Sequence, residues 1–357
     1  MPPTSRISSI DALRGLTVAA MLLVNDAGDW SHVYPWLEHA EWHGATPADF
    51  IFPFFMLIVG ISLQLALGGK VEARAPAAPM ARAVLVRGVR IVLLGLALHA
   101  AAALLLHGRD FRLLGVLQRI GVCFAVAGLL AIYLPRARTQ WAILAGILLG
   151  YWALLTAGGS LAPELNLADR IDTALLGRLA YQFNPVTGQA HDPEGVLSTL
   201  PSLATVILGM RAGAWLRARD LRALLLAGVA ATALGALWSL WLPLNKQLWT
   251  SSFVLWMGGL GMLAVGLAHS LIDRHGWPDL GRCLGINAIA AYAGAWIATC
   301  LLEGSGAMQP LYDAVFRLPL TPLAGPFLPS LLFAAAFTGL FWLAMHGFER
   351  RGWRITI

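Results

Sequence analysis

The sequence predicts an all-α fold, a polytopic integral membrane bundle of about ten transmembrane helices. Of its 357 residues, 58% are hydrophobic and only 12% are charged, and the mean hydropathy is +0.69, far above that of an ordinary soluble domain. The apolar residues gather in windows of about 20, the length that crosses a hydrocarbon core of about 30 Å. Because no linker rich in Ser, Pro or Gly divides the chain, one transmembrane domain over residues 1–357 is expected.

The expected spans follow one another with short polar segments between them. In chain order they are 9–26, 49–68, 83–106, 113–134, 140–158, 195–213, 222–242, 251–271, 283–302 and 325–347. The first has no small-residue cleavage site, so it is expected to be a retained helix rather than a signal peptide. The second and sixth are preceded by helix-capping sequences, Thr46-Pro47-Ala48-Asp49 and Asp192-Pro193-Glu194-Gly195.

The basic residues predict how the helices are oriented. Seventeen Lys and Arg residues fall on the side of one alternating set of loops, and six fall on the opposite side. Cytoplasmic loops carry the excess of Lys and Arg, so both termini are expected in the cytoplasm, which agrees with an even number of spans. The isoelectric point of about 9.6 is not accompanied by a nucleic-acid-binding motif, and no nucleic-acid partner is expected.

The cysteines give no sign of a disulfide framework or a metal centre. Cys123, Cys283 and Cys300 all fall within or beside expected spans, where a thiol behaves as a small apolar group. Their spacing does not match a zinc site, and no metal cofactor is expected.

Ionisable groups inside spans are costly unless they have partners, so they mark candidate functional positions. Arg87 and Arg90 share one face of the third span at i, i+3 spacing. They could equally extend to lipid headgroups from the cytoplasmic end of that helix. Arg119, beside Gln118, lies deeper, so it either pairs with a buried acid such as Asp11 or lines a wet cavity.

The loop 27–48 contains His32, His39 and His43 next to acidic residues. His39 is the best candidate for proton chemistry, because an imidazole with an ordinary pKa of about 6.5 acts as a base at neutral pH. Such a loop could also simply be solvated, or bind a metal weakly, since the histidine spacings of seven and four residues do not define a metal site. Asp49 after the loop could be only a helix cap, as could Asp192 and Glu194 before the sixth span.

Several of these residues belong to ordered motifs that resemble one family. The opening motifs are Ser9-Ile10-Asp11-Ala12-Leu13-Arg14-Gly15, Val24-Asn25, His39-Ala40-Glu41-Trp42-His43-Gly44 and Ala48-Asp49-Phe50-Ile51-Phe52-Pro53-Phe54-Phe55. The later ones are Gly115-Val116-Leu117-Gln118-Arg119-Ile120-Gly121-Val122, His191-Asp192-Pro193-Glu194-Gly195, Pro243-Leu244-Asn245-Lys246-Gln247-Leu248-Trp249 and Gly285-Ile286-Asn287-Ala288. In order and spacing they resemble the heparan-alpha-glucosaminide N-acetyltransferase family, lysosomal and bacterial.

The resemblance implies a membrane-embedded acetyltransferase. It would move an acetyl group from cytosolic acetyl-CoA to the amino group of a glucosamine-type sugar on the far side of the membrane. By resemblance the catalytic pair is Asn25 and His39. His39 would take the proton of the attacking amine or carry the acetyl group transiently, and Asn25 would orient or stabilise the reacting carbonyl. Both routes need the same residues, so both remain open.

The expected binding residues divide between donor and acceptor. For the CoA phosphates we expect Arg14, Arg87 and Arg90, because guanidinium groups match phosphate geometry. On the acceptor side the candidates are Asp49, Gln118, Arg119, Asp192, Glu194, Asn245 and Lys246. The loops are shorter than in the lysosomal enzyme, so a small amino sugar or glycan fragment is expected. The other expected partner is the bilayer, as the inner membrane of a bacterium, and a second copy of the chain is left open.

Two other functions remain open. Spans with buried Arg, Asn and Asp would also suit an amino-sugar transporter, although no duplicated half is visible in the sequence. A non-catalytic scaffold or lipid-binding protein would use the same polar residues only to pack helices.

Overall fold

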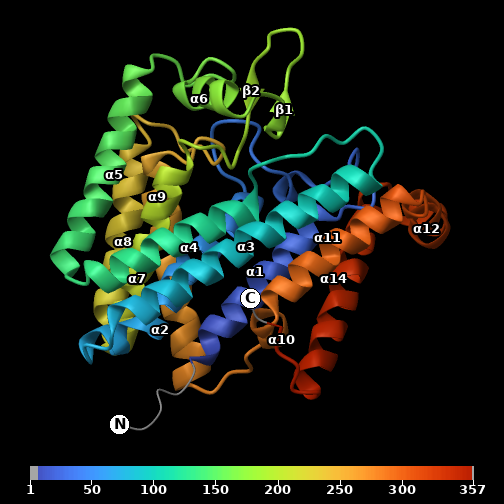
Figure 1. Cartoon of the computed structure of the whole chain (residues 1–357). Coiled ribbons are helices and arrows are strands. Elements are labelled where there is room, and N and C mark those ends of the chain that lie inside the picture. The colour runs from blue at the N-terminus through green and yellow to red at the C-terminus, as the bar shows by residue number, and fades with distance from the viewer. Residues whose placement is uncertain (1–6, 356–357) are drawn as a thin grey trace.

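The computed structural model describes residues 7–355 and shows a bundle of long helices (Figure 1). The helices are α1 (Ser8–Asn25), α2 (Ile51–Glu72), α3 (Ala77–Leu105), α4 (Val116–Tyr133), α5 (Ala137–Ala157), α6 (Leu167–Leu175), α7 (Thr199–Arg217), α8 (Leu221–Trp238), α9 (Ser251–Ala268), α10 (Arg282–Ile286), α11 (Ala288–Gly304), α12 (Met308–Tyr312), α13 (Leu318–Ala324) and α14 (Phe327–Arg350). Two short strands, β1 (Gln182–Phe183) and β2 (Ala190–His191), pair antiparallel. The predicted all-α class is confirmed.

Within residues 7–355, seven helical segments are long and apolar enough to cross a membrane. They are Pro47–Glu72, Ala77–Leu105, Val116–Tyr133, Ala137–Ala157, Leu221–Trp238, Ser251–Arg274 and Phe327–Arg350. The bent pair Ala288–Gly304 and Met308–Ala324, which meet at 98°, would make an eighth if they form one span. The chain is therefore a multi-pass integral membrane protein.

The other two expected spans, 9–26 and 195–213, fall on α1 and α7. These helices have 18 and 19 residues, but polar side chains interrupt their apolar runs. Asp11 and Arg14 do so in α1, and Arg211 is among those in α7. Both helices are extensively buried by neighbouring helices, and a helix covered by protein does not need a continuous apolar surface. The total of ten spans and the cytoplasmic placement of both termini stay predictions.

Small residues let the inner helices pack closely. A Cβ atom at Gly60 of α2 would lie 2.0 Å from the Val206 carbonyl oxygen, and one at Gly209 of α7 would lie 2.1 Å from the Leu57 carbonyl oxygen. The backbones of α2 and α7 are therefore in direct contact, which is typical of membrane helix interfaces. This contact fixes α2, the helix that follows the loop carrying His39.

Three loops far apart in the sequence form a polar layer over one end of the bundle, on the side where Figure 1 shows α6, β1 and β2. The backbone N–H of Gly44 donates to the Leu244 carbonyl at 2.8 Å. The indole N–H of Trp42 donates to the Leu161 carbonyl at 2.8 Å. The layer consequently joins segments 26–50, 159–198 and 239–250.

Candidate active site

Asp49 organises the loop that carries His39. The short 3₁₀ turn η2 (Pro47–Phe50) leads directly into α2. The Asp49 carboxylate is fully buried, and its Oδ2 accepts hydrogen bonds from the Thr46 N–H at 2.9 Å, the Thr46 hydroxyl at 3.2 Å and the Ala40 N–H at 3.1 Å. The capping role expected from sequence is thus present. It uses only one of the two carboxylate oxygens.

The other oxygen of Asp49 contacts His39. The His39 Nδ1 atom lies 2.8 Å from Asp49 Oδ1, and the imidazole is 44% exposed while the carboxylate is buried. A neutral ring that donates its Nδ1–H to the carboxylate keeps its lone pair on Nε2. The pair therefore has the geometry of an oriented base, with the carboxylate behind the ring and the ring accessible to a ligand.

Lys246 lies next to both His39 and Asp49. Its Nζ atom lies 3.0 Å from Nδ1 and 3.1 Å from Nε2 of His39, and 3.4 Å from Asp49 Oδ1. Burial lowers the pKa of the Lys246 ammonium, while Asp49 and Glu194 oppose this shift. The cation compensates the charge of the buried carboxylate next to the ring.

Asn245 shapes the loop that carries Lys246. Its side chain is buried, and its Oδ1 accepts the Leu248 N–H at 2.7 Å. Its Nδ2 lies 3.4 Å from His43 Nδ1. Asn245 therefore folds its own loop and links it to the histidine loop.

A second histidine and carboxylate pair lies beside the first group. His191 Nδ1 is 2.7 Å from Asp169 Oδ1, and His191 Nε2 is 2.6 Å from Gln247 Oε1. Gln247 also donates from its Nε2 to the Glu41 carbonyl at 3.0 Å. Burial disfavours a charged His191 ring, yet the Asp169 carboxylate raises the pKa of His191 overall. A protonated ring satisfies both oxygen neighbours.

Sequence reasoning did not single out His191, Asp169 or Gln247. His191 opens one of the quoted motifs and Gln247 lies within another, and these positions were the available signals. Asp169 lies 22 residues earlier in the chain, in a short helix that no motif marked.

Asp192 and Glu194, both expected acceptor residues, are engaged by Arg112. The Arg112 guanidinium contacts Asp192 at 3.1 and 2.5 Å and also contacts Glu194. Burial opposes ionisation of Glu194, but the Arg112 charge lowers the pKa of Glu194 overall. The backbone N–H of Tyr181 also donates to Asp192 at 2.9 Å. This ion-paired cluster braces the polar layer, and the sequence gave no indication of Arg112.

Arg119 and Gln118 lie beneath this cluster. The Arg119 side chain is almost fully buried and donates to the Gly195 carbonyl at 3.3 Å and to Ser198. Its guanidinium lies 5.3 Å from the centre of the Trp249 ring. Arg119 is thus directed toward the 192–198 segment. Gln118 donates to the Leu113 carbonyl at 3.1 Å, next to Arg112 in the chain.

Asn25 is the exposed last residue of α1. Its neighbour Val24 packs in one apolar cluster with Leu37 and Ala48, so the end of α1 lies near the His39 loop. Within residues 7–355 no hydrogen bond joins Asn25 to His39. The two members of the expected catalytic pair thus lie on neighbouring segments, and in the described residues no hydrogen bond links them.

The three arginines expected to hold CoA lie in different surroundings. Arg14 donates to Asp11 at 3.0 Å, to the Ser62 hydroxyl at 2.7 Å and to the Gly285 carbonyl at 3.3 Å, so it joins α1, α2 and α10. Arg87 and Arg90 are exposed on α3.

Comparison with known proteins bears on this site. A family model described as heparan-alpha-glucosaminide N-acetyltransferase, catalytic, matches residues 6–242. The human protein named heparan-alpha-glucosaminide N-acetyltransferase is 26% identical over 355 residues, covering 82% of this chain and 53% of the human protein. The mouse protein of that name is 25% identical over 358 residues, covering 81% and 53%. The chain thus spans about half the length of these curated relatives.

The raised pKa of His191 leads to a prediction about stability and pH. A protonated His191 stabilises the fold fully below the ring's unfolded pKa of about 6.5, and this contribution is lost as pH rises through the higher folded-state pKa. We predict that His191→Gln lowers the thermal unfolding midpoint in detergent more at pH 5.5 than at pH 9. At low pH the loss should correspond to about 2 kcal/mol, the scale of a charge-assisted hydrogen bond.

The control is His107→Gln, because His107 is exposed. A midpoint difference for His191→Gln that stays constant across the pH range would contradict the protonated state.

Proposed function

We propose, because the chain belongs to the heparan-alpha-glucosaminide N-acetyltransferase catalytic family, that it transfers an acetyl group from acetyl-CoA to the amino group of a glucosaminide-type sugar. The observation that carries the proposal is His39, held 2.8 Å from the buried Asp49 carboxylate, with a ring that is 44% exposed and so accessible to a ligand. An acetyl transfer to an amine needs a base at such a position. Residues 1–357 act in this proposal as one transmembrane acyltransferase domain.

The direct route is written with His39 as the base. The sugar nitrogen forms a bond to the thioester carbonyl carbon, and Nε2 of His39 takes the ammonium proton that this attack creates. The carbon–sulfur bond then breaks, and the CoA thiolate leaves and receives this proton from His39, which returns the ring to its neutral form. In the alternative route Nε2 itself attacks the thioester and the CoA thiolate leaves; the amine then takes the acetyl group from Nε2 and releases a proton that balances the one taken up by the thiolate. Asp49 stabilises the positively charged ring in either route.

Lys246 and Asn25 are proposed to assist this step. The Lys246 ammonium lies about as close to Nε2 as to Nδ1 of His39, so it can stabilise negative charge that develops on a carbonyl oxygen next to the ring. Asn25 is exposed nearby at the end of α1, where its amide could donate to the same oxygen. Within residues 7–355 it makes no hydrogen bond to His39, which suits a residue that binds the substrate rather than the base.

The acceptor is proposed to bind in the polar layer. Asp192 and Glu194 are held in this layer by Arg112, and Glu194 contributes to the electrostatics of Lys246. Asn245, Gln118 and the buried Arg119 would act by holding the loops in place. Carboxylates and amides suit the ammonium and hydroxyl groups of an amino sugar.

The donor is proposed to enter from the opposite, basic end of the bundle. Arg87 and Arg90 are exposed on one face of α3, where they would meet the phosphates of CoA, although the Arg87 guanidinium also lies 5.3 Å from the centre of the Phe124 ring. Arg14 already has partners on three helices, and its contact with CoA would require an exchange of those hydrogen bonds. With the polar layer outside and the basic end inside, a bacterial inner-membrane enzyme would use cytosolic acetyl-CoA.

We predict that His39→Ala removes transfer activity and that Asp49→Asn reduces it. General base catalysis contributes roughly 10² to 10⁴ in rate, so His39→Ala should lose at least about a hundredfold. The assay uses purified protein with labelled acetyl-CoA and glucosamine, and it measures the acetylated sugar. The control is His269→Ala, since His269 also lies 2.8 Å from a carboxylate, that of Asp273. Full activity in His39→Ala would reject the proposal. CoA-independent sugar uptake into proteoliposomes would favour a transporter instead.

The pH profile tests Lys246. Because burial lowers the pKa of this lysine, its cation is lost as pH rises through a value below the ordinary 10.5, and wild-type kcat/KM should fall on the alkaline side. Lys246→Arg keeps its charge at every accessible pH, so its alkaline fall should move to higher pH even if the overall rate is lower. Lys246→Met should be slow throughout. Identical alkaline limbs for wild type and Lys246→Arg would show that this cation does not act in the reaction.

A further inference from the structure

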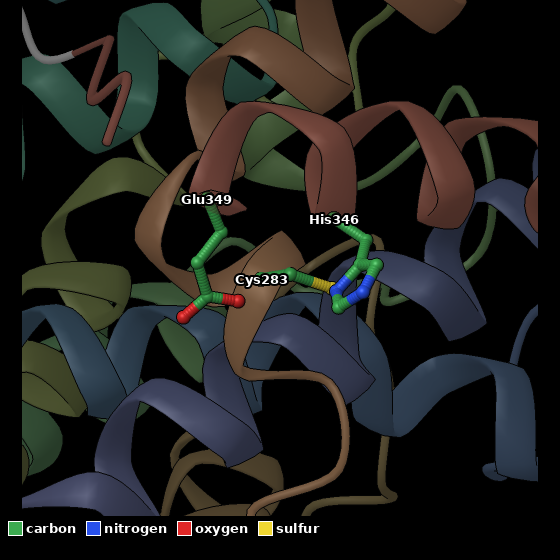
Figure 2. A group of neighbouring side chains, drawn as sticks. All are labelled: Cys283, His346 and Glu349. Carbon is green, nitrogen blue, oxygen red and sulfur yellow. The ribbon is translucent and has the colours of Figure 1, made fainter. Parts of the chain in front are cut away.

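We propose that Cys283, His346 and Glu349 form a binding site for a divalent transition-metal ion of the Zn²⁺ and Co²⁺ class. One ligand atom from each residue lies within 4.8 Å of the other two. Figure 2 shows the Cys283 sulfur beside the His346 ring, with the Glu349 carboxylate on the same side of α14. These residues belong neither to the polar layer nor to the group around His39.

Two helices supply the ligands. His346 and Glu349 are three residues apart on α14, so they share one face of that helix. Cys283 lies on α10, and its Sγ approaches the Trp342 carbonyl of α14 at 4.0 Å. In a tetrahedral site with bonds of about 2.0 to 2.3 Å, ligand atoms are roughly 3.3 to 3.7 Å apart. The three atoms thus need shifts of only about 1 Å to close on an ion.

The donor set selects the ion. A thiolate, an imidazole and a carboxylate suit Zn²⁺ or Co²⁺, whereas Mg²⁺ and Ca²⁺ prefer oxygen ligands alone. On binding, the Cys283 thiol releases its proton to water and bonds through the thiolate. Thiolate and carboxylate together balance the charge of the ion. Three protein ligands leave the fourth position for a water molecule.

The site can be reached, and its carboxylate is available. His346 is exposed and Glu349 is partly exposed, while Cys283 is buried. The Arg282 Nε atom lies 3.6 Å from Glu349 Oε1, and Arg282 also contacts Asp279 at 3.3 Å. Because Arg282 has this second partner, Glu349 can turn to an ion without leaving the guanidinium unpaired.

The sequence gave no sign of such a site, because Cys283 is more than sixty residues from its partners. The expectation that there is no metal cofactor rested on spacing along the chain. Folding brings α10 against α14 and also against α1, where a Cβ at Gly285 would lie 1.8 Å from the Asp11 carbonyl oxygen. An ion here would tie α14 to α10 and, through α10, to α1.

The test is a Co²⁺ titration of the full-length chain, purified in detergent and freed of metal with a chelator. We expect about one equivalent of Co²⁺ to produce visible ligand-field bands and a near-ultraviolet thiolate-to-cobalt charge-transfer band. Zn²⁺ should abolish both. Cys283→Ser should lose the charge-transfer band, and the matched control Cys300→Ser should keep it. No charge-transfer band in the wild-type protein, or an unchanged band in Cys283→Ser, would overturn the proposal.

Two further variants keep the test independent of the buried cysteine. His346→Gln and Glu349→Gln alter more accessible side chains, and each should weaken Co²⁺ binding by about tenfold or more. The metal-free His346→Gln variant should unfold at the wild-type temperature, since the ligands are then not joined. Wild-type affinity in both variants would overturn the site.

Discussion

The buried carboxylate of Asp49 is the group on which the rest of the site depends. A carboxylate without solvent must be matched by hydrogen bonds and by positive charge, or it becomes strongly destabilising. Here the matching groups are Thr46 and Ala40 on its own loop, the imidazole of His39 and the ammonium of Lys246. Satisfying this one group therefore fixes the His39 ring and draws the 239–250 loop against the 26–50 loop.

The helices beneath the layer supply the rigidity that this arrangement needs. Asp49 lies in the turn that begins α2, and α2 is in backbone contact with α7 at Gly60 and Gly209. The segment that opens α7 carries the carboxylates held by Arg112. Both sides of the layer are thus mounted on one closely packed helix pair. A site on such a support can hold a base in position within a loop that is otherwise exposed.

The sequence predicted the features formed by residues close together in the chain and missed the contacts between residues far apart in it. The long apolar windows predicted the helices, and the Thr46–Asp49 cap could be predicted because its residues are only three positions apart in the chain. Lys246 contacts His39 from the 239–250 loop. The sequence indicates Lys246 only as an acceptor candidate and not as a neighbour of His39, because 207 residues separate the two. Arg112 and Asp169 were missed because nothing local marks them. Within residues 7–355, seven or eight helices are long and apolar enough to cross a membrane, where ten were expected, since buried inner helices such as α7 tolerate polar residues.

The central claim is that a thioester reaches His39. A structure of the chain bound to a non-reactive acetyl-CoA analogue tests it most directly. The account predicts that the acetyl carbonyl lies beside Nε2 of His39, roughly 5 Å away or less, so that an amine fits between them. The nucleotide end should then lie toward the opposite end of the bundle. An analogue whose acetyl end stops short of the polar layer, with His39 facing only water, would contradict the account.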